Sequence, residues 1–278
     1  MREIMFSILV VALNPGDKLI QTVKSILSQS YSDYQVVIKD GGSTDDSMKL
    51  LETFLQEEVT ENRNRIHLIR KKDSSIYDGM NQATAYAQGK YYYFLNCGDL
   101  LAGQDTLGKV AAEITKVRKE GKSALIYYGN ILDALRNQVV QSNPKIDDFA
   151  CYRNVPCHQA CIYHYSLFEE RGYKPEFRVR GDYEHFLWSY FKKNANPKYV
   201  DVVLASYEGG GFSESKENRK RSAKEHKVIT NMYMSKVQLF CYGTILLLTL
   251  APLRTKMAES RLFAGGYQKI KKLLYGRG

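Results

Sequence analysis

"FSILVVALNPGDKLIQTVKSILSQSYSDYQVVIKDGG", residues 6–42, contains two apolar runs separated by a helical pattern. The first run, residues 6–13, is almost entirely apolar, which is typical of a strand covered on both faces. "NPGD" ends this run, and apolar residues at helical spacing begin at Leu19. The second run, residues 34–40, ends in an aspartate followed by two glycines. The stretch therefore predicts a strand, a helix and a second, parallel strand.

The same alternation continues along the chain. A helix carrying Met48, Leu51 and Leu55 precedes a short strand at residues 66–70. "YDGMNQATAYAQGK" then predicts a helix for which Gly89 is the C-terminal stop, and "YYYF" opens a fourth strand. This order predicts an α/β protein with a mainly parallel, right-handed, doubly wound (Rossmann-like) sheet.

The pattern becomes less regular after Asp105. We expect a helix at residues 106–120 and strands at 124–128 and 139–142. "GDYEHFLWSYFKK" predicts a helix with Asp182 as its N-cap, and residues 198–207 predict a late strand.

Polar residues follow four of the expected strands. Because ligands of such sheets bind beyond the carboxyl ends of the strands, we expect these residues to meet at one rim. Folding of the sheet requires none of them, so the rim is the candidate site. The residues are Asn14; Asp40, Gly41, Gly42 and Ser43; Asp73 and Asp78; and Asn96 with Asp99.

The net charge of +10 suits an anionic partner, such as a nucleic acid, a phosphorylated small molecule or an acidic membrane face. The acidic rim argues against a nucleic-acid groove there, and we expect no nucleic-acid partner. The C-terminal third carries most of the excess positive charge, in two groups. These are Lys216, Arg219, Lys220, Arg221, Lys224 and Lys227, and then Arg254, Lys256, Arg261, Lys269, Lys271, Lys272 and Arg277.

Residues 237–253 form a run of 17 without a charge, slightly short of the about 20 that span a bilayer. Basic residues flank the run, so a helix inserted in the membrane surface fits better than a span, with a dimer interface as the alternative. The N-terminus shows no signal peptide and the five cysteines are odd in number, which together indicate reduced thiols in the cytoplasm. Cys151, Cys157, His158, Cys161 and His164 lack the paired spacing of a zinc site, which favours buried thiols.

No phosphate-binding loop or dinucleotide fingerprint is present. A carboxylate at a strand end can instead ligate Mg²⁺ or Mn²⁺, and the metal can hold a diphosphate. A reaction that transfers the group carried by this diphosphate to an acceptor hydroxyl, with the diphosphate as leaving group, needs a base to take the hydroxyl proton. Asp182, at the tip of a helix, is a suitable candidate. The chemistry alone leaves Asp182 open as a base or as a plain helix cap.

Several motifs, in one order, resemble family 2 glycosyltransferases. The stretch quoted first continues into "DGGSTDDS", "SSIYDGMNQATAYAQGKYYYFLNCGD" resembles the second block of the family, and "PCHQACIYHYSLFEERGY" with "RGDYEHFL" resembles its polysaccharide-assembly members in bacteria. The resemblance covers about residues 5–212. It implies a GT-A fold at residues 1–212, with a nucleotide-sugar half (1–105) and an acceptor half (106–212), followed by a helical, basic and apolar extension at 213–278.

The resemblance also implies a nucleotide-diphosphate sugar donor, a saccharide or lipid-linked acceptor, Mg²⁺ or Mn²⁺, and inversion at the anomeric carbon. We expect a role in bacterial surface polysaccharide biosynthesis, at the inner face of the cell membrane. Asp182 would be the base and Asp99 the metal ligand. Asn14, Asp40, Gly41, Ser43, Asp78, Asn81 and Asn96 would lie on the nucleotide side, and His158, Gln159 and Glu184 on the sugar or acceptor side.

The sequence departs from the family pattern at the metal element, where Asn96-Cys97-Gly98-Asp99 offers one carboxylate. Gly79 and Gln82 replace the commoner Ala and Lys, and Arg178 or Arg180 is a candidate for positive charge near the diphosphate. Two other function classes remain possible at this point: a nucleotidyltransferase on a related sheet and a non-catalytic basic binding module.

Overall fold

The computed structural model describes residues 4–209 and 215–249. The chain divides into two compact units, Met1–Ile229 and Thr230–Gly278. The expected domain boundary at 212/213, the end of the apolar run after 249, and the basic residues from Arg254 onward lie outside the described residues. The N-terminal half contains β1 (Phe6–Ala12), α1 (Lys18–Leu27), β2 (Tyr34–Asp40), α2 (Ser47–Glu57), α3 (Thr60–Arg65), β3 (Ile66–Arg70), α4 (Ile76–Thr84), β4 (Tyr91–Phe94) and β5 (Leu100–Leu101).

The later elements include two short 3₁₀ helices, η1 and η2, beside an inserted strand. They are α5 (Thr106–Lys119), β6 (Ile126–Asp133), β7 (Gln138–Val140), α6 (Asp148–Arg153), η1 (His158–Ala160), β8 (Cys161–His164), η2 (Tyr165–Leu167), α7 (Gly181–Lys193), β9 (Pro197–Tyr207), α8 (Lys216–Tyr233) and α9 (Lys236–Leu248).

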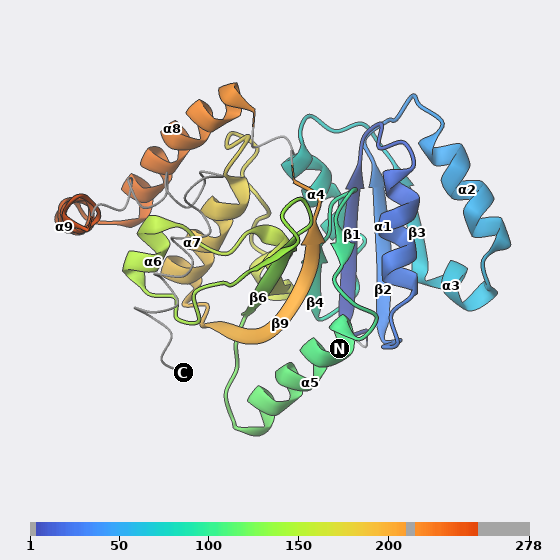
Figure 1. Cartoon of the computed structure of the whole chain (residues 1–278), viewed down its shortest axis with the longest axis horizontal. Helices are drawn as coiled ribbons and strands as arrows, with labels where there is room; N and C mark the ends of the chain where they lie inside the picture. Colours follow the sequence, from blue (N-terminus) through green and yellow to red (C-terminus); the bar gives the residue numbers. More distant parts are fainter. Residues whose placement is uncertain (1–3, 210–214, 250–278) are drawn as a thin grey trace. The chain divides into compact units, whose positions relative to one another are not determined.

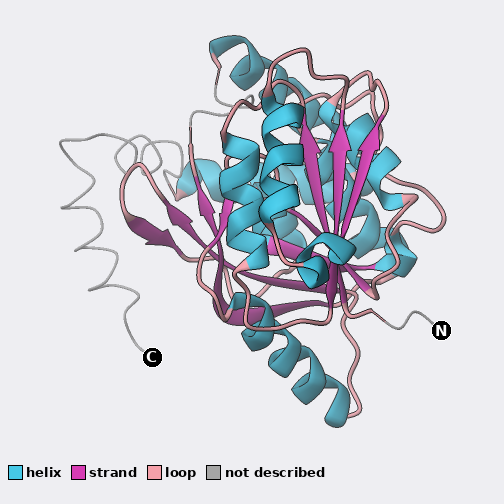
Figure 2. Cartoon of the chain, turned by 90° about the vertical axis from the view of Figure 1, so that its right-hand side faces the viewer, coloured by secondary structure: helices cyan, strands magenta, loops and turns pink. Residues whose placement is uncertain are grey.

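One sheet of nine strands runs through the described part of Met1–Ile229, in the order β3-β2-β1-β4-β8-β6-β9-β5, with β7 on β6 (Figure 1). β1 pairs in parallel with β2 and β4, β2 with β3, and β6 with β9. β8 is antiparallel to both β4 and β6, while β5 and β7 are antiparallel edge strands. Figure 2 shows neighbouring arrows of the sheet pointing the same way. The prediction of a mainly parallel sheet is confirmed.

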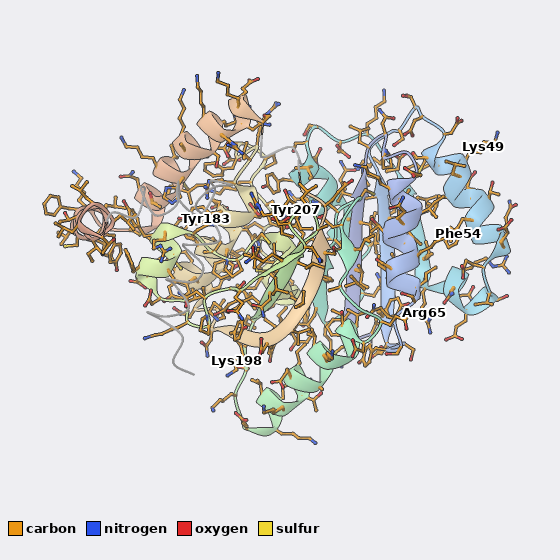
Figure 3. The ribbon with its side chains drawn as sticks, in the orientation of Figure 1. Lys49, Phe54, Arg65, Tyr183, Lys198 and Tyr207 are labelled. Carbon is orange, nitrogen blue, oxygen red and sulfur yellow. The ribbon has the colours of Figure 1, made fainter. Side chains whose placement is uncertain are left out.

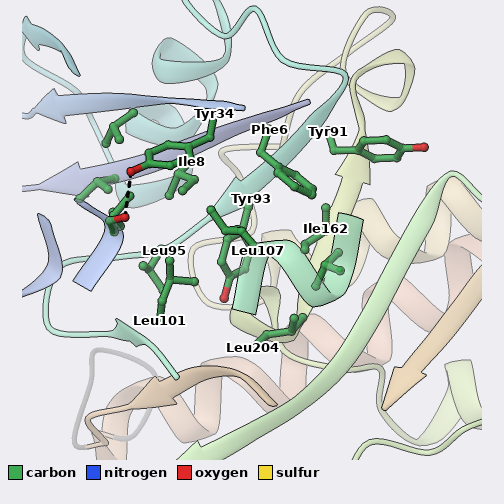
Figure 4. Close-up of a cluster of buried hydrophobic side chains, with 14 of the residues drawn as sticks. Phe6, Ile8, Tyr34, Tyr91, Tyr93, Leu95, Leu101, Leu107, Ile162 and Leu204 are labelled. Atoms are coloured by element: carbon green, nitrogen blue, oxygen red, sulfur yellow. Dashed lines mark hydrogen bonds between the residues drawn. The ribbon is translucent and has the colours of Figure 1, made fainter. Parts of the chain in front are cut away.

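Alternate residues of the central strands face two helical layers. Phe6, Ile8 and Val10 of β1 belong to the same buried cluster as Leu19 of α1 and Leu107 of α5 (Figure 4). On the opposite face α4 packs so closely that a Cβ at Gly79 would lie 2.7 Å from Val11 Cγ1. With a helix layer on each face, both sets of side chains are buried, which explains the continuous apolar pattern of β1.

The expectation that α4 extends to Gly89 is wrong, because the helix ends at Thr84. Gly89 has another role: a Cβ there would lie 2.5 Å from Ser7 N and 2.6 Å from Phe6 C. Only glycine lets the chain pass this close to β1 as it enters β4. Other elements shift by a few residues; the strand expected at 124–128 is β6, which continues to Asp133.

In the unit Thr230–Gly278, α9 begins with a capping box between Ser235 and Gln238. Its apolar side chains extend in all directions and none is buried; Phe240 is 76% and Leu248 76% exposed. Among the described residues, no helix combines the length and apolar character that crossing a bilayer requires.

Candidate active site

The turn after β4 holds its shape because of a glycine. Asp99 N donates to Asn96 O at 3.0 Å, and Gly98 has φ +98°, the left-handed region that the third position of a type II turn requires. A Cβ at Gly98 would also lie 2.5 Å from Glu208 Oε2. Thr22 of α1 fixes the turn by accepting a hydrogen bond from Gly98 N (3.1 Å) and donating one to Asp99 O (2.9 Å).

This turn presents Asp99 to a partly closed cavity, with 5% of the residue exposed. Gln159 Nε2 donates to Asp99 Oδ2 at 2.9 Å, and Glu208 N donates to Asp99 Oδ1 at 3.2 Å. Burial raises the pKa of Asp99 above its ordinary value, although both hydrogen bonds act in the opposite direction. The carboxylate is therefore held in one orientation, with a lone pair left on each oxygen.

Asp182 is the second residue of α7 and not its N-cap, which is Arg180. The helix begins two residues earlier than expected because Gly181 lets its first turn lie against Tyr77, two of whose ring carbons would be 2.8 Å from a Cβ there. Asp182 Oδ1 accepts hydrogen bonds from the Tyr77 hydroxyl (3.0 Å) and from Tyr183 N (2.9 Å). Asp182 Oδ2 lies 3.3 Å from His158 Nδ1.

His158 joins the Asp182 carboxylate to the turn after β4. Asn96 Nδ2 lies 2.8 Å from His158 Nε2, and since an amide nitrogen donates, the imidazole proton is on Nδ1, facing Asp182. Burial raises the pKa of Asp182, but the hydrogen bond and attraction from His158, with bonds from Tyr183 N and Tyr77, bring it below its ordinary value overall. Asp182 is therefore ionised at neutral pH and aligned by two side chains.

Two adjoining cavities surround these groups. The smaller, of about 400 Å³, is lined by Asp182, Asp99 and the pair His158–Gln159. The larger, of about 530 Å³, lies on the β1 side and reaches Lys18 and Asp73. Ile76, Asn96, Cys97 and Arg178 line both cavities. They therefore form one cleft along the carboxyl ends of the strands, where ligands of open α/β sheets bind.

The structure distinguishes the two candidate arginines. Arg178 is exposed at the junction of the cavities, and its guanidinium makes no ion pair with the described residues. Arg180 instead donates from Nε to Ser222 Oγ (2.7 Å) and lies over the Tyr183 ring at 5.3 Å. Arg178 is available to an anion in the cleft, whereas Arg180 holds neighbouring elements together.

Four residues expected on the nucleotide side join two loops. Asn14, in the left-handed region with φ 48°, donates from its backbone to Ser43 Oγ (2.8 Å) and accepts from Thr44 N (2.8 Å). Ser43 in turn donates to Asp40 Oδ1 through Oγ (2.6 Å) and N (3.0 Å). None of Asn14, Asp40, Gly41 and Ser43 lines either cavity of the described residues, so their contacts support the loops that follow β1 and β2.

The structure does not bring Asp78, Asn81 or Glu184 into the cleft of the described residues. Asp78 Oδ2 accepts from Ser74 N (2.8 Å), a capping bond that lowers its pKa. Asn81 bonds the backbone of Tyr173 from both amide atoms (2.8 and 2.7 Å). Glu184 lies two positions after Asp182, on another side of α7, where both of its oxygens accept from the Arg171 guanidinium at 2.9 and 3.0 Å.

Sequence reasoning missed several cleft residues. Tyr77 and Tyr207 line the cleft; Tyr207 is labelled at the tip of β9 in Figure 3. Sequence patterns assign such aromatic residues to the core. Lys18 pairs with Glu208 at 2.8 Å, an ion pair between residues 190 positions apart. Their position just after β1 and β9 was the available signal, because strand ends in this fold reach the same rim.

The donor atoms around Asp99 decide whether the site fits the implied divalent ion. Among the described residues, no three His, Cys, Asp or Glu side chains are placed to hold a metal. This applies both to the Cys and His residues at 151–164 and to the surroundings of Asp99. Asp99 keeps free lone pairs, however, and the buried Asn96 Oδ1 has no hydrogen-bond partner in the described structure. Oxygen donors of this kind fit Mg²⁺ or Mn²⁺, provided that a bound diphosphate completes the coordination.

A family model described as glycosyl transferase family 2 matches residues 7–183, more than half of the chain. The chain belongs to this family. The PGL/p-HBAD biosynthesis glycosyltransferase of Mycobacterium bovis is 32% identical over 213 residues, covering 76% of this chain and 80% of that protein. An uncharacterized glycosyltransferase of Mycobacterium tuberculosis is 27% identical, with 76% and 78% coverage.

Solved structures agree on the fold of this family 2 chain. TarS of S. aureus in complex with UDP-GlcNAc has a TM-score of 0.62 at 17% identity, covering 84% of this chain and 69% of that one. A Pyrobaculum calidifontis mannosyltransferase in complex with GDP-Man and Mn²⁺ has a TM-score of 0.57 at 13% identity, covering 98% and 88%. The GT-A fold is confirmed, and the family and its relatives establish that the chain is a glycosyltransferase.

Proposed function

We propose that this glycosyltransferase moves a sugar, with inversion, from a nucleoside-diphosphate donor to a hydroxyl of a saccharide or lipid-linked acceptor in bacterial surface polysaccharide biosynthesis. The observation that carries the proposal is a single hydrogen-bonded chain, from Asp182 through His158 to Asn96, beside the Asp99–Gln159 pair. This chain puts an oriented carboxylate and a candidate diphosphate site in one cleft.

Asp182 is suited to take the proton from the acceptor hydroxyl. It is ionised, and the hydrogen bonds from His158 and Tyr77 fix its direction before the acceptor binds. As the hydroxyl oxygen attacks the anomeric carbon it becomes acidic, so a carboxylate of low pKa can accept the proton late in the displacement. A single displacement with the base on the acceptor side inverts the anomeric configuration.

The larger cavity is the proposed place for the nucleoside diphosphate. Arg178 faces the junction between the cavities, and Lys18 lies farther along the wall. A guanidinium can bind two phosphate oxygens at once. The positive charge of Arg178 would thus help to hold the diphosphate, for which the Asn96–Asp99 turn offers a metal ion only one carboxylate ligand. TarS and the mannosyltransferase, the structural neighbours, were solved with UDP-GlcNAc and GDP-Man, which supports a donor of this class.

Asp99 and Asn96 would hold the divalent ion. When bound, Mg²⁺ or Mn²⁺ would neutralise charge on the departing nucleoside diphosphate. Gln159 and Glu208 N keep Asp99 pointed into the cleft, independently of the ion.

We also propose that the protein works as a peripheral protein at the cytoplasmic face of the membrane. Lys216, Lys220, Lys224 and Lys227 are exposed and recur at helical spacing on the side of α8 opposite Glu225. Such a stripe attracts anionic headgroups, and α9 supplies apolar side chains that could insert at the surface. Vesicle flotation tests this: Phe240→Ser should weaken binding, and high salt should weaken it further. If neither Phe240→Ser nor high salt weakens flotation, the proposal of a peripheral membrane protein is rejected.

Transfer itself is tested with the full chain, a panel of nucleotide sugars and Mn²⁺, with released nucleotide as the readout. Asp182→Asn should abolish transfer, whereas Asp46→Asn, an exposed aspartate whose side chain makes no cap bond, should not. NMR of the product reports the anomeric configuration. Turnover by Asp182→Asn at the wild-type rate, or a product with retained configuration, would reject the mechanism.

A further inference from the structure

A buried carboxylate of α8 holds the segment that leads into α7. Glu225 is 8% exposed, and its Oε1 accepts a hydrogen bond from Arg178 N at 3.0 Å. Its Oε2 accepts from Val179 N at 3.0 Å and from Arg180 N at 2.8 Å. Three consecutive backbone amides therefore converge on one side chain that is 45 to 47 positions away in sequence.

The same three residues carry both halves of the proposed chemistry. The Arg178 side chain reaches the junction of the two cavities, where the diphosphate is proposed to lie. Val179 O accepts from the Tyr77 hydroxyl at 3.0 Å, and Tyr77 also orients Asp182. A shift of this segment would displace the arginine and the base together.

Other contacts anchor this part of α8 beside the segment. Arg180 Nε donates to Ser222 Oγ at 2.7 Å. His226 bonds Tyr152 O at 2.8 Å and stacks on Tyr183, with ring centroids 5.2 Å apart (Tyr183 is labelled in Figure 3). Burying a carboxylate costs free energy, which the ion pair of Glu225 Oε1 with the half-exposed Arg221, at 3.7 Å, offsets only in small part. The amide of the exposed residue Arg178 could bond to water instead. The gain from Glu225 is therefore a fixed position for the segment.

We propose that Glu225 is a positioning residue for sugar transfer, which acts through Arg178 and the start of α7. The inference rests on the proposed function, because it assigns Arg178 to the diphosphate. The first part of α8 follows the expected domain boundary at 212/213. With this role for Glu225, it nevertheless contributes to the catalytic function of the unit Met1–Ile229.

A double-mutant cycle between Glu225 and Arg178 tests the proposal in the full chain. Glu225→Gln keeps one acceptor oxygen but replaces the other with a donor, so at least one of the three hydrogen bonds is lost. Calorimetry with Mn²⁺ and each of UDP, GDP and dTDP should show about fivefold to tenfold weaker binding of whichever nucleotide binds. In an Arg178→Ala background the same change should have less than about a twofold effect, because the group being positioned is gone. Glu217→Gln, on an exposed site of the same helix, is the charge-matched control and should bind normally.

Each outcome decides the question. Additive losses in the cycle, or normal binding by Glu225→Gln, would overturn the role of Glu225 while leaving the proposed function intact. If the wild-type chain binds none of the three nucleotides, the proposed function is overturned and this inference with it. If Glu225→Gln does not fold, Glu225→Asp, which is shorter by one methylene, completes the cycle. Misfolding of both would make Glu225 a folding residue and reject the positioning role.

Discussion

Adding one methyl group at Gly181 should disable the proposed base without touching its carboxylate. In Gly181→Ala the new Cβ would lie 2.8 Å from two ring carbons of Tyr77 and 3.0 Å from a third. Carbon atoms normally approach to about 3.5 Å, so the ring or the start of α7 must move by about 0.7 Å. Tyr77 is 5% exposed and bonds both Val179 O and Asp182, so its ring cannot turn into solvent.

Overpacking of this size costs about 1–3 kcal/mol of stability, and a misplacement of about 1 Å at a reacting group costs about 100-fold in rate. We therefore expect kcat to fall about 10- to 100-fold in Gly181→Ala, with a lower melting temperature and a smaller change in KM for the donor. Gly108→Ala, within α5, is the matched control, because the nearest atom to a Cβ there is Tyr31 Cβ at 3.8 Å, an ordinary contact distance. That variant should be fully active and slightly more stable. Wild-type kcat in Gly181→Ala would refute the argument that Tyr77 ties the start of α7 to the base.

Three further predictions concern the ionisable groups of the cleft. Burial raises the pKa of Asp99 above 3.8, the ordinary value for an aspartate, so Mn²⁺-dependent nucleotide binding should already weaken at a pH above 3.8 as the pH falls. Calorimetry that finds unchanged affinity down to pH 3.8 would contradict this. His158→Ala removes the bond that lowers the pKa of Asp182, so the acid limb of kcat should move to higher pH and kcat should fall about 10- to 100-fold; an unshifted pH–rate profile would argue against the pairing. Arg178→Ala should weaken nucleotide binding about tenfold, whereas Arg180→Ala should lower only the melting temperature, and equal effects on binding would remove the distinction between them.

The parallel core of the fold was predictable because its strands are covered on both faces. β1 is an almost continuous apolar run and β2 has an apolar centre at residues 36–38, and the turn signals "NPGD" and "DGG" mark where the two strands end. From this order alone the carboxyl ends of the strands share a rim, which brings Asn96 and Asp99 into the cleft as expected. β8 was not foreseen as an antiparallel strand between β4 and β6, because the direction of an inserted strand depends on tertiary pairing that no local pattern records.

The sequence alone did not show which polar residues of a motif face the cleft and which bond to other parts of the fold. Asn81 and Glu184 look like site residues, yet their partners are backbone atoms of Tyr173 and the side chain of Arg171, brought near by the fold. Glu208 gave no signal except its position just after β9, although its backbone amide orients Asp99 from 109 positions away. A carboxylate or amide that satisfies a buried partner has the same letter in the sequence as one that faces a ligand, and only the contacts tell them apart.

The dipeptide His158–Gln159 explains why two distant motifs work as one site. Both residues lie in the 3₁₀ turn η1, which the Tyr93 hydroxyl holds by donating to Gln159 O at 2.9 Å. His158 reaches Asn96 on one side and Asp182 on the other, while Gln159 reaches Asp99. The proposed base and the proposed diphosphate side are thus both held by η1, through different side chains. Electrostatic stabilisation depends on groups that are already oriented when charge develops, and η1 orients the groups at both ends of the proposed reaction without a bound substrate.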